Sequence, residues 1–179
     1  REGEILWDLA ESEKISVFGV SAKYISAQEK AEIIPKNIAN LSSIKTILST
    51  GSPLAPESFD YVYRDIKSDI QLSSVSGGTD IISCFVSGNP ILPVRRGELQ
   101  CLGLGMAVEI YDDQGASVIE ENGELVCTKS FPSMPIYFWN DTKNEKYHAA
   151  YFERYNGIWC QGDFAMITRS GGMVIHGRS

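Results

Sequence analysis

The run "IKTILSTGSPLAPESFDYVYRDIKSDIQLSSVSGGTD", residues 44–80, decides the fold because it contains a strand, a helix and a further strand. Residues 44–50 predict a strand, and residues 70–75 predict another, because Ile70, Gln71 and Leu72 alternate between apolar and polar side chains. Between them, Pro56 stands in the first turn of a helix that we expect to reach about Lys67. Strand, helix and strand in this order are typical of a parallel sheet.

The residues before this run continue the same alternation. Residues 2–11 have apolar side chains at helical spacing, and residues 15–20 predict another buried strand. A helix is then expected to start with Ser26 as its N-cap, with Glu29 completing a capping box, and Pro35 should end or kink it. The sequence thus predicts an α/β fold, with part of a parallel sheet flanked by helices.

After about residue 92 the pattern changes to short alternating runs separated by turns such as Asp113-Gln114-Gly115 and Ser170-Gly171-Gly172. Such runs predict an antiparallel β-barrel-like subdomain. The segment 87–97 contains the prolines Pro90 and Pro93 and ends in Gly97, and these residues break regular structure. We therefore expect two domains, an α/β subdomain over 1–92 and a β-rich subdomain over 93–179.

Composition restricts the class of protein. The 179 residues carry a formal net charge of −7 without a basic block, which argues against a nucleic-acid partner. No apolar run reaches the roughly 18 residues that a membrane-spanning helix needs. The four cysteines form no C-x-x-C pair, so buried, reduced thiols in a cytoplasmic protein are expected rather than a zinc site. Because the sequence begins with Arg1 rather than Met, we expect it to be an internal piece of a longer protein.

Two glycine-containing turns follow predicted strands, at 51–53 and at 76–80. Ligands of open parallel sheets bind beyond the carboxyl ends of the strands, and glycine lets backbone approach a ligand closely. Thr79 offers a hydroxyl suited to a phosphate oxygen, and Asp80 offers an oxygen ligand suited to Mg²⁺. The alternative interpretation is two ordinary surface turns.

Two further residues stand beside glycines in the β-rich half. Asp163 precedes an apolar strand and could accept hydrogen bonds from a diol such as a ribose, or cap its own turn. Arg178 could pair with a phosphate, or be a solvated charge. Core packing is the expected role of the three tryptophans, Trp7, Trp139 and Trp159.

These features occur together in a known family. On "STGSPLAPESF" (49–59), "SSVSGGTDIISCFVSGNPILPVRRGELQCLGLGMAVE" (73–109), "GELVCTKSFPSMPIYFWND" (123–141) and "WCQGDFAMITRSGGMVIHGRS" (159–179), the chain resembles the adenylate-forming acyl-CoA synthetases. The resemblance implies ATP, Mg²⁺ and coenzyme A as ligands. It implies a ligase that joins a short carboxylic acid to coenzyme A through an acyl-adenylate, with acetoacetate as the first expectation. Acetate or propionate as the acid, or a non-catalytic nucleotide-binding module, are the alternatives.

The resemblance also implies a role for each candidate residue. Nucleotide binding is expected of Gly51, Ser52 and Pro53 at the adenine, of Ser74, Val75, Ser76, Gly77, Gly78 and Thr79 along the nucleotide, of Asp163 at the ribose and of Arg178 at ribose or phosphate. Thr79 at the α-phosphate and Asp80 at the metal are the expected catalytic residues.

The chain departs from the family pattern at two places. Ser76 and Gly77 stand where the family often has an aromatic residue beside the adenine, and their small size would widen the neighbouring acyl pocket. Asp80 replaces the usual glutamate and shortens the reach to the metal by one methylene. The family's phosphate loop is expected before Arg1, and its hinge and lid lysine after Ser179, so the isolated chain is expected to form adenylate at no useful rate.

Overall fold

The computed structural model describes residues 3–179, so Arg1 and Glu2 lie outside the described residues. Glu2 is the first residue of the helix predicted over 2–11. The chain forms two compact units. The first contains the residues up to Val75 together with Gly88–Gln100, and the second contains Ser76–Ser87 together with Cys101–Ser179. The chain therefore passes from one unit to the other three times, whereas the predicted domains divide once, near residue 92; that division stays a prediction.

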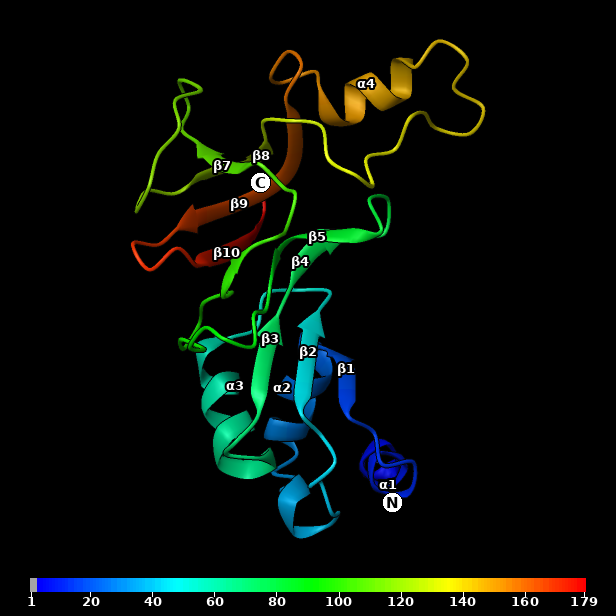
Figure 1. Ribbon diagram of the computed structural model, residues 1–179, viewed down its shortest axis with the longest axis vertical. Coiled ribbons are helices and arrows are strands. Elements are labelled where there is room, and N and C mark those ends of the chain that lie inside the picture. Colours follow the sequence, from blue (N-terminus) through cyan, green and yellow to red (C-terminus); the bar gives the residue numbers. More distant parts are fainter. Residues whose placement is uncertain (1–2) are drawn as a thin grey trace. The chain divides into compact units, whose positions relative to one another are not determined.

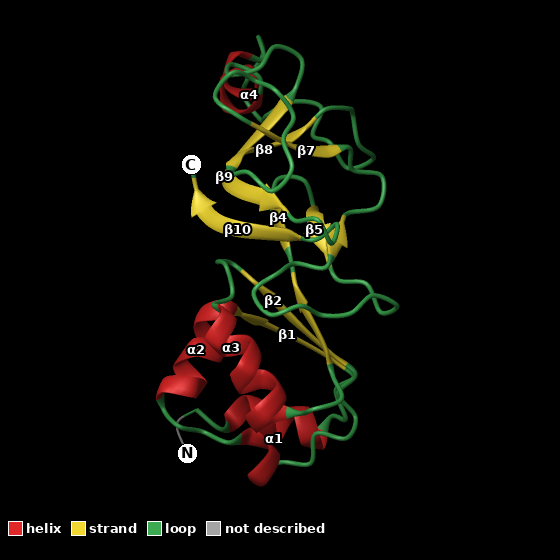
Figure 2. Ribbon diagram, turned by 90° about the vertical axis from the view of Figure 1, so that its left-hand side faces the viewer, coloured by secondary structure: helices red, strands yellow, loops and turns green. Residues whose placement is uncertain are grey.

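A parallel three-stranded sheet forms the centre of the first unit. Its strands are β1 (Val17–Ser21), β2 (Thr46–Thr50) and β3 (Gln71–Ser74), paired in the order β1-β2-β3. The helices are α1 (Ile5–Ser12), α2 (Ala22–Lys30) and α3 (Pro56–Tyr61), with a 3-10 turn at Pro35–Asn37 and a π-helical turn at Val62–Ile66. Figure 2 shows α2 and α3 together on one side of the strands. The predicted parallel sheet with helices is confirmed.

Strand and helix faces of this unit meet in one apolar core. Ile47 of β2 and Leu72 of β3 are at most 1% exposed, and they pack in one cluster with Ile25 of α2 and Phe59 of α3. Trp7 from α1 joins the same cluster and donates its indole N–H to Gln28 at 2.8 Å. This packing fixes the strands from which the carboxyl-end turns emerge.

The predicted start of α2 is wrong. Ser21, the last residue of β1, is the N-cap, and its hydroxyl accepts a hydrogen bond from the backbone N–H of Tyr24 at 3.1 Å. Ser21 can cap because its backbone is still extended, so the helix starts as soon as the strand ends. Glu29 completes no capping box and instead accepts a hydrogen bond from Ser58 of α3 at 3.0 Å.

Antiparallel strands dominate the second unit, as predicted. One sheet contains β4 (Ser76–Gly78), β5 (Ser83–Ser87) and β6 (Cys101–Leu102). The other has the order β10-β9-β8-β7 and contains β7 (Val108–Tyr111), β8 (Gly123–Cys127), β9 (Trp159–Ile167) and β10 (Met173–Arg178). A short helix, α4 (Glu145–Tyr151), precedes β9 along the chain (Figure 1). Within residues 3–179, no helix combines the length and the apolar character needed to cross a membrane.

Residues 76–78 form strand β4, where the sequence predicted a turn. Gly77 explains the difference, because a Cβ built on it would lie 2.1 Å from the carbonyl oxygen of Ser83 on β5. The absent side chain therefore lets a neighbouring strand approach, in addition to any role toward a ligand. The turn itself falls at residues 79–82, between β4 and β5.

Candidate nucleotide site

The first group of candidate residues lies at the carboxyl ends of β2 and β3, within the first unit. Ser49 of β2 is in register with Ser74 of β3, and the N–H of Val75 donates to the carbonyl of Ser49 at 2.9 Å. The turn 51–53 begins directly after β2 with Gly51 at φ +84°, a backbone conformation that favours glycine. The structure thus brings Ser74 and Val75 next to the strand that leads into the turn at Gly51, Ser52 and Pro53.

The second group is built around a bulge in β9. Between two paired positions of β8 and β9, β8 has one residue, Leu125, whereas β9 has three, residues 161–163. On the other side, β10 has one extra residue, His176, between the partners of Ala165 and Phe164, so that Arg178 comes into register with Asp163. Gly162 makes the bulge possible, because its φ is +76° and a Cβ there would lie 2.7 Å from the Arg178 guanidinium. The irregular register of β9 and β10 therefore places the Asp163 carboxylate beside the Arg178 guanidinium.

Asp163 is 8% exposed and is held by partners on two other strands. Its Oδ1 accepts a hydrogen bond from Arg178 Nη1 at 2.9 Å, and its Oδ2 accepts one from the Ser76 hydroxyl at 3.4 Å. Burial raises the pKa of the Asp163 carboxyl above its ordinary value, although Arg178 and Ser76 act in the opposite direction. A carboxylate has about four lone-pair positions, so two remain for further donors.

Thr79 and Asp80 lie in the exposed turn between β4 and β5. The hydroxyl of Tyr151, from α4, donates to Oδ2 of Asp80. Tyr151 is in turn stacked on Trp159 of β9, with ring centroids 3.6 Å apart. Burial, followed by the hydrogen bond to Asp80, raises the pKa of Tyr151 well above its ordinary value. The turn is therefore connected to β9 through two aromatic rings.

The chemistry of the Thr79–Asp80 turn fits a magnesium ion carried by a nucleotide. Across residues 3–179, no three His, Cys, Asp or Glu side chains gather as a metal cage would require. Mg²⁺ commonly needs no such cage, since one or two carboxylates suffice when phosphates and water supply the other ligands. Asp80 is an exposed carboxylate next to a hydroxyl, which matches that mode of binding.

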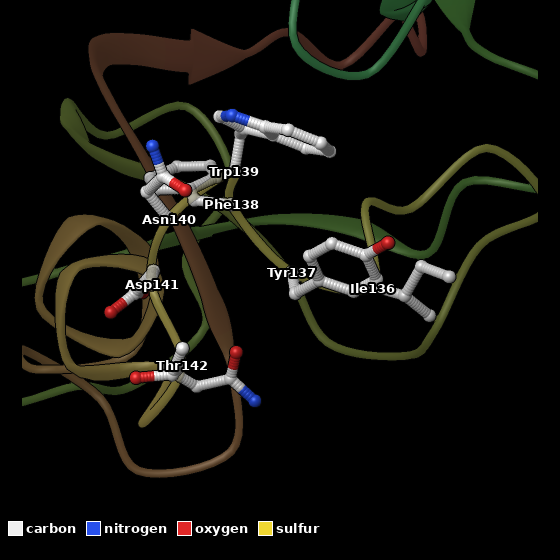
Figure 3. A pocket seen from close by; sticks show the side chains of 8 residues that line it. Ile136, Tyr137, Phe138, Trp139, Asn140, Asp141 and Thr142 are labelled. Atoms are coloured by element: carbon white, nitrogen blue, oxygen red, sulfur yellow. The ribbon is translucent and has the colours of Figure 1, made fainter.

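A separate open hollow of ≈ 420 Å³ lies in the loop that leads to α4 (Figure 3). Its lining consists of residues 136–142 and Asn144, and no residue predicted to bind nucleotide is among them. Trp139 in this loop is 85% exposed, so its predicted core role is wrong. Its neighbour Phe138 takes the inner position, with its ring 5.3 Å from that of Tyr147.

Sequence reasoning missed three residues of the second group. Tyr151 and Gln161 gave no signal, although Gln161 contributes the carbonyl that accepts Arg178 Nη1 at 3.0 Å. Glu124 could have been found, because it is a lone carboxylate in the otherwise apolar strand pattern of residues 123–127. The structure brings Ser76, Asp163 and Arg178 into direct contact as one cluster in the second unit.

Comparison with known proteins gives this arrangement a context, although no family model matches the chain. Over 178 residues the chain is 57% identical to an acetoacetyl-coenzyme A synthetase of Rhizobium meliloti (strain 1021), spanning 99% of this chain and 27% of that protein. It is 48% identical over 176 residues to an acetoacetyl-CoA synthetase of Mus musculus, spanning 98% of this chain and 26% of that protein.

Solved structures agree with the sequence matches. An acetoacetyl-CoA synthetase from Streptomyces lividans superposes with a TM-score of 0.91 at 43% identity, covering 99% of this chain and 28% of that one. An anthranilate CoA ligase in complex with anthranoyl-AMP gives a TM-score of 0.80 at 17% identity, with 99% and 32% covered, and supports the fold alone.

The fold and these matches place the chain in the adenylate-forming acyl-CoA synthetase family, as its sequence motifs indicated. Within that family its homologues are acetoacetyl-CoA synthetases, and the chain spans about a quarter, 26–27%, of the length of the two that we compare.

Proposed function

We propose that this chain is the nucleotide-binding part of a ligase that activates acetoacetate with ATP and transfers it to coenzyme A. The observation that carries the proposal is the 57% identity over 99% of the chain to an acetoacetyl-coenzyme A synthetase. The same match supports ATP and coenzyme A as substrates. The mixture of acidic and basic residues without a basic block supports small-molecule partners rather than nucleic acid, and the free cysteines support the cytoplasm as its location.

The proposed reaction solves a problem of carboxylate chemistry. A carboxylate resists attack because its charge is delocalised, so one of its oxygens first attacks the α-phosphorus of ATP and pyrophosphate leaves. The coenzyme A thiolate then attacks the carbonyl carbon of the acyl-adenylate, and AMP leaves with the bonding electrons. Neither step needs a covalent bond to the protein, which has to position the groups and stabilise the charge.

The second unit supplies the residues that we assign to ribose and phosphate. Asp163 has the two unused lone-pair positions that a ribose diol requires, and Arg178 beside it adds a positive charge for ribose or phosphate oxygens. The hydroxyl of Thr79 would donate to the α-phosphate. Asp80 would hold Mg²⁺, which when bound supplies positive charge to the phosphates.

The first unit supplies the residues that we assign to the base. Gly51, Ser52 and Pro53 form an accessible turn in which backbone can lie against the flat adenine without an intervening Cβ at Gly51. Ser74 and Val75 continue the chain toward Ser76 and the residues assigned to the nucleotide. These assignments rest on the family resemblance together with the carboxyl-end position of the turn.

Pyrophosphate release by the full-length protein, measured with acetoacetate, acetate and propionate, tests the proposal. ATP-dependent release that is at least several-fold faster with acetoacetate would support it. Equal or greater release with acetate or propionate would move the assignment to another short acid. Absence of release with every acid, while AMP still binds, would indicate a nucleotide-binding module without ligase activity.

A further inference from the structure

Glu124 of β8 is the most deeply buried carboxylate among the residues that surround the bulge. It is 2% exposed, and its side chain has three partners. Oε2 accepts a hydrogen bond from Arg154 Nη1 at 2.5 Å, while Oε1 accepts from the Cys160 thiol at 3.4 Å and from the Ser179 hydroxyl at 3.2 Å. A carboxylate in this position requires explanation, because burial of a charge is unfavourable and a buried ion pair is weak evidence for stability.

The partners of Glu124 lie on both sides of the bulge that carries Asp163. Cys160 is on β9 before the bulge, and Glu124 itself is in register with Phe164 after it. Ser179 directly follows Arg178 at the end of β10, and its N–H donates to the carbonyl of Gly162 within the bulge at 3.0 Å. One carboxylate therefore ties together the start of the bulge and the end of the neighbouring strand.

These contacts account for the position of the Asp163–Arg178 pair. The bulge leaves residues 161–163 of β9 without ladder partners on β8, and the pairing of Asp163 with Arg178 on β10 follows a register shift, so regular ladder pairing alone does not fix the direction of the Asp163 side chain. Glu124 is hydrogen-bonded to Cys160 and Ser179. Cys160 lies three residues before Asp163, and Ser179 directly follows Arg178. Among the described residues, the hydrogen-bond partners of Glu124 are Arg154, Cys160 and Ser179, and none of these is a candidate nucleotide residue.

We propose that Glu124 is a positioning residue for nucleotide binding: it holds the β9 bulge and the end of β10 so that Asp163 and Arg178 face the ribose and phosphate together. The proposal rests on the proposed function, since it presumes that Asp163 binds ATP. It predicts that Glu124 affects the affinity for ATP and leaves the affinity for the acid unchanged.

Glu124→Leu in the full-length protein tests the proposal, because leucine fills a similar volume and removes all three bonds without leaving an unpaired buried charge. Arg154 loses its partner but is half exposed. We expect the Kd for ATP, from isothermal titration calorimetry, and the KM for ATP to rise about tenfold, which corresponds to one charge-assisted hydrogen bond. The midpoint of thermal unfolding and the KM for acetoacetate should stay at the values of the unmodified protein.

Glu109→Leu is the matched control. Glu109 is also a carboxylate bonded to a hydroxyl, that of Thr128 at 3.1 Å, but it lies on β7 and is bonded to no residue of the bulge. Its replacement should leave the Kd for ATP unchanged. Ser179→Ala removes only the hydrogen bond from the Ser179 hydroxyl to Glu124, so it should raise the Kd for ATP by a smaller factor. This variant tests the positioning role if Glu124→Leu does not fold.

Three results would overturn the proposal. An unchanged Kd for ATP in Glu124→Leu or Ser179→Ala, with a raised Kd in Asp163→Asn, would refute positioning by Glu124 and leave the nucleotide site in place. An equal rise in the KM values for ATP and acid, with a lowered unfolding midpoint, would reduce Glu124 to a structural role. An unchanged Kd in Asp163→Asn would remove both the nucleotide site and the positioning role.

Discussion

The absence of a side chain at Gly77 allows β4 and β5 to pair. Any side chain at this position would begin with a Cβ 2.1 Å from the Ser83 carbonyl oxygen and 2.7 Å from Cα of Cys84. Both obstacles are backbone atoms, which cannot turn away as a side chain can. The small residue that the sequence analysis connected with a wider acyl pocket is therefore also required by the sheet.

Gly77→Ala is expected to lower the free energy of unfolding by about 1–3 kcal/mol, the usual effect of overpacking. Gly19→Ala on β1 is the control, because a Cβ there meets no atom within 4 Å and should change stability by less than about 1 kcal/mol. Urea unfolding of both variants measures the difference. Equal stabilities of the two would show that β5 gives way easily and that the close approach is not a constraint.

The thiol of Cys160 provides a pH test at the same scale. Burial, followed by the Glu124 carboxylate, raises the pKa of Cys160 from 9.0 to about 11. Because the folded state holds the proton more tightly, the contribution of this group to stability is complete below pH 9 and is lost as the pH rises toward about 11.

Cys160→Ala should therefore flatten the decline of stability between pH 9 and about pH 11. Denaturant unfolding at a series of pH values, for the variant and the unmodified protein, gives the two slopes. The difference between them isolates the contribution of the Cys160 thiol, because the two proteins share all their other titratable groups. Parallel slopes would mean that the thiol is as accessible to ionisation in the folded state as in the unfolded one.

At the scale of elements, the sequence predicted the parallel half well and the details of the second half less well. Strands β1 and β2 lie in short apolar runs rich in β-branched residues, and β3 follows the alternation of Ile70, Gln71 and Leu72, so their pattern is visible in the local sequence. Strand β4 could not be predicted, because serine and glycine have low strand propensity. Ser76, Gly77 and Gly78 adopt strand structure because they pair with β5. Helix α4 is seven residues long, too short for a reliable helical period.

The bulge in β9 shows the same limit. Asp163 and Arg178 were selected from the sequence because each stands beside a glycine, yet their direct contact depends on irregular register in two adjacent strands. Such register shifts depend on how neighbouring strands pair, and they leave no periodic signal in the sequence. The lone carboxylate of Glu124 is visible in the sequence, but its partners are not, since they lie 30 to 55 positions away in sequence.

Helix α4 contributes Tyr151, whose ring and hydroxyl have separable effects. The ring stacks on Trp159, and the hydroxyl donates to Asp80. Tyr151→Phe should keep the stacking and change the free energy of unfolding by at most about 1.5 kcal/mol, the usual value of one hydrogen bond. Tyr151→Ala should lower it by about 2–4 kcal/mol through loss of aromatic packing.

Thermal and urea unfolding of the two variants, with Tyr137→Phe as a control on an exposed tyrosine of the same unit, measure this difference. A loss in Tyr151→Phe as large as that in Tyr151→Ala would assign the stability to the bond with Asp80 rather than to the stacked rings.

At the scale of the whole molecule, the chain forms two compact units that exchange segments at Val75–Ser76, Ser87–Gly88 and Gln100–Cys101. The sequence predicted a change of character near residue 92 but not this interleaving, because Gly88–Gln100 contacts residues far away in sequence. Gln100, for example, donates to Leu92 and Asn89 and also accepts from Gln71 on β3. The segment belongs to the first unit through such contacts.

The central claim is that Asp163 is a nucleotide ligand rather than a structural cap. Because burial raises its pKa, the charged form is disfavoured in the folded state, and a neutral side chain of the same shape should be tolerated at pH 7. Arg178, which would lose its partner, is largely exposed and can be solvated. Function and stability are therefore expected to separate at this residue.

The most direct test is the Kd for ATP of full-length Asp163→Asn, measured by titration calorimetry together with its unfolding midpoint. We predict a Kd raised about tenfold or more, from the loss of charge-assisted hydrogen bonds, with an unfolding midpoint equal to or above that of the unmodified protein. An unchanged Kd with a lowered midpoint would show that Asp163 serves the fold alone, and would contradict the account.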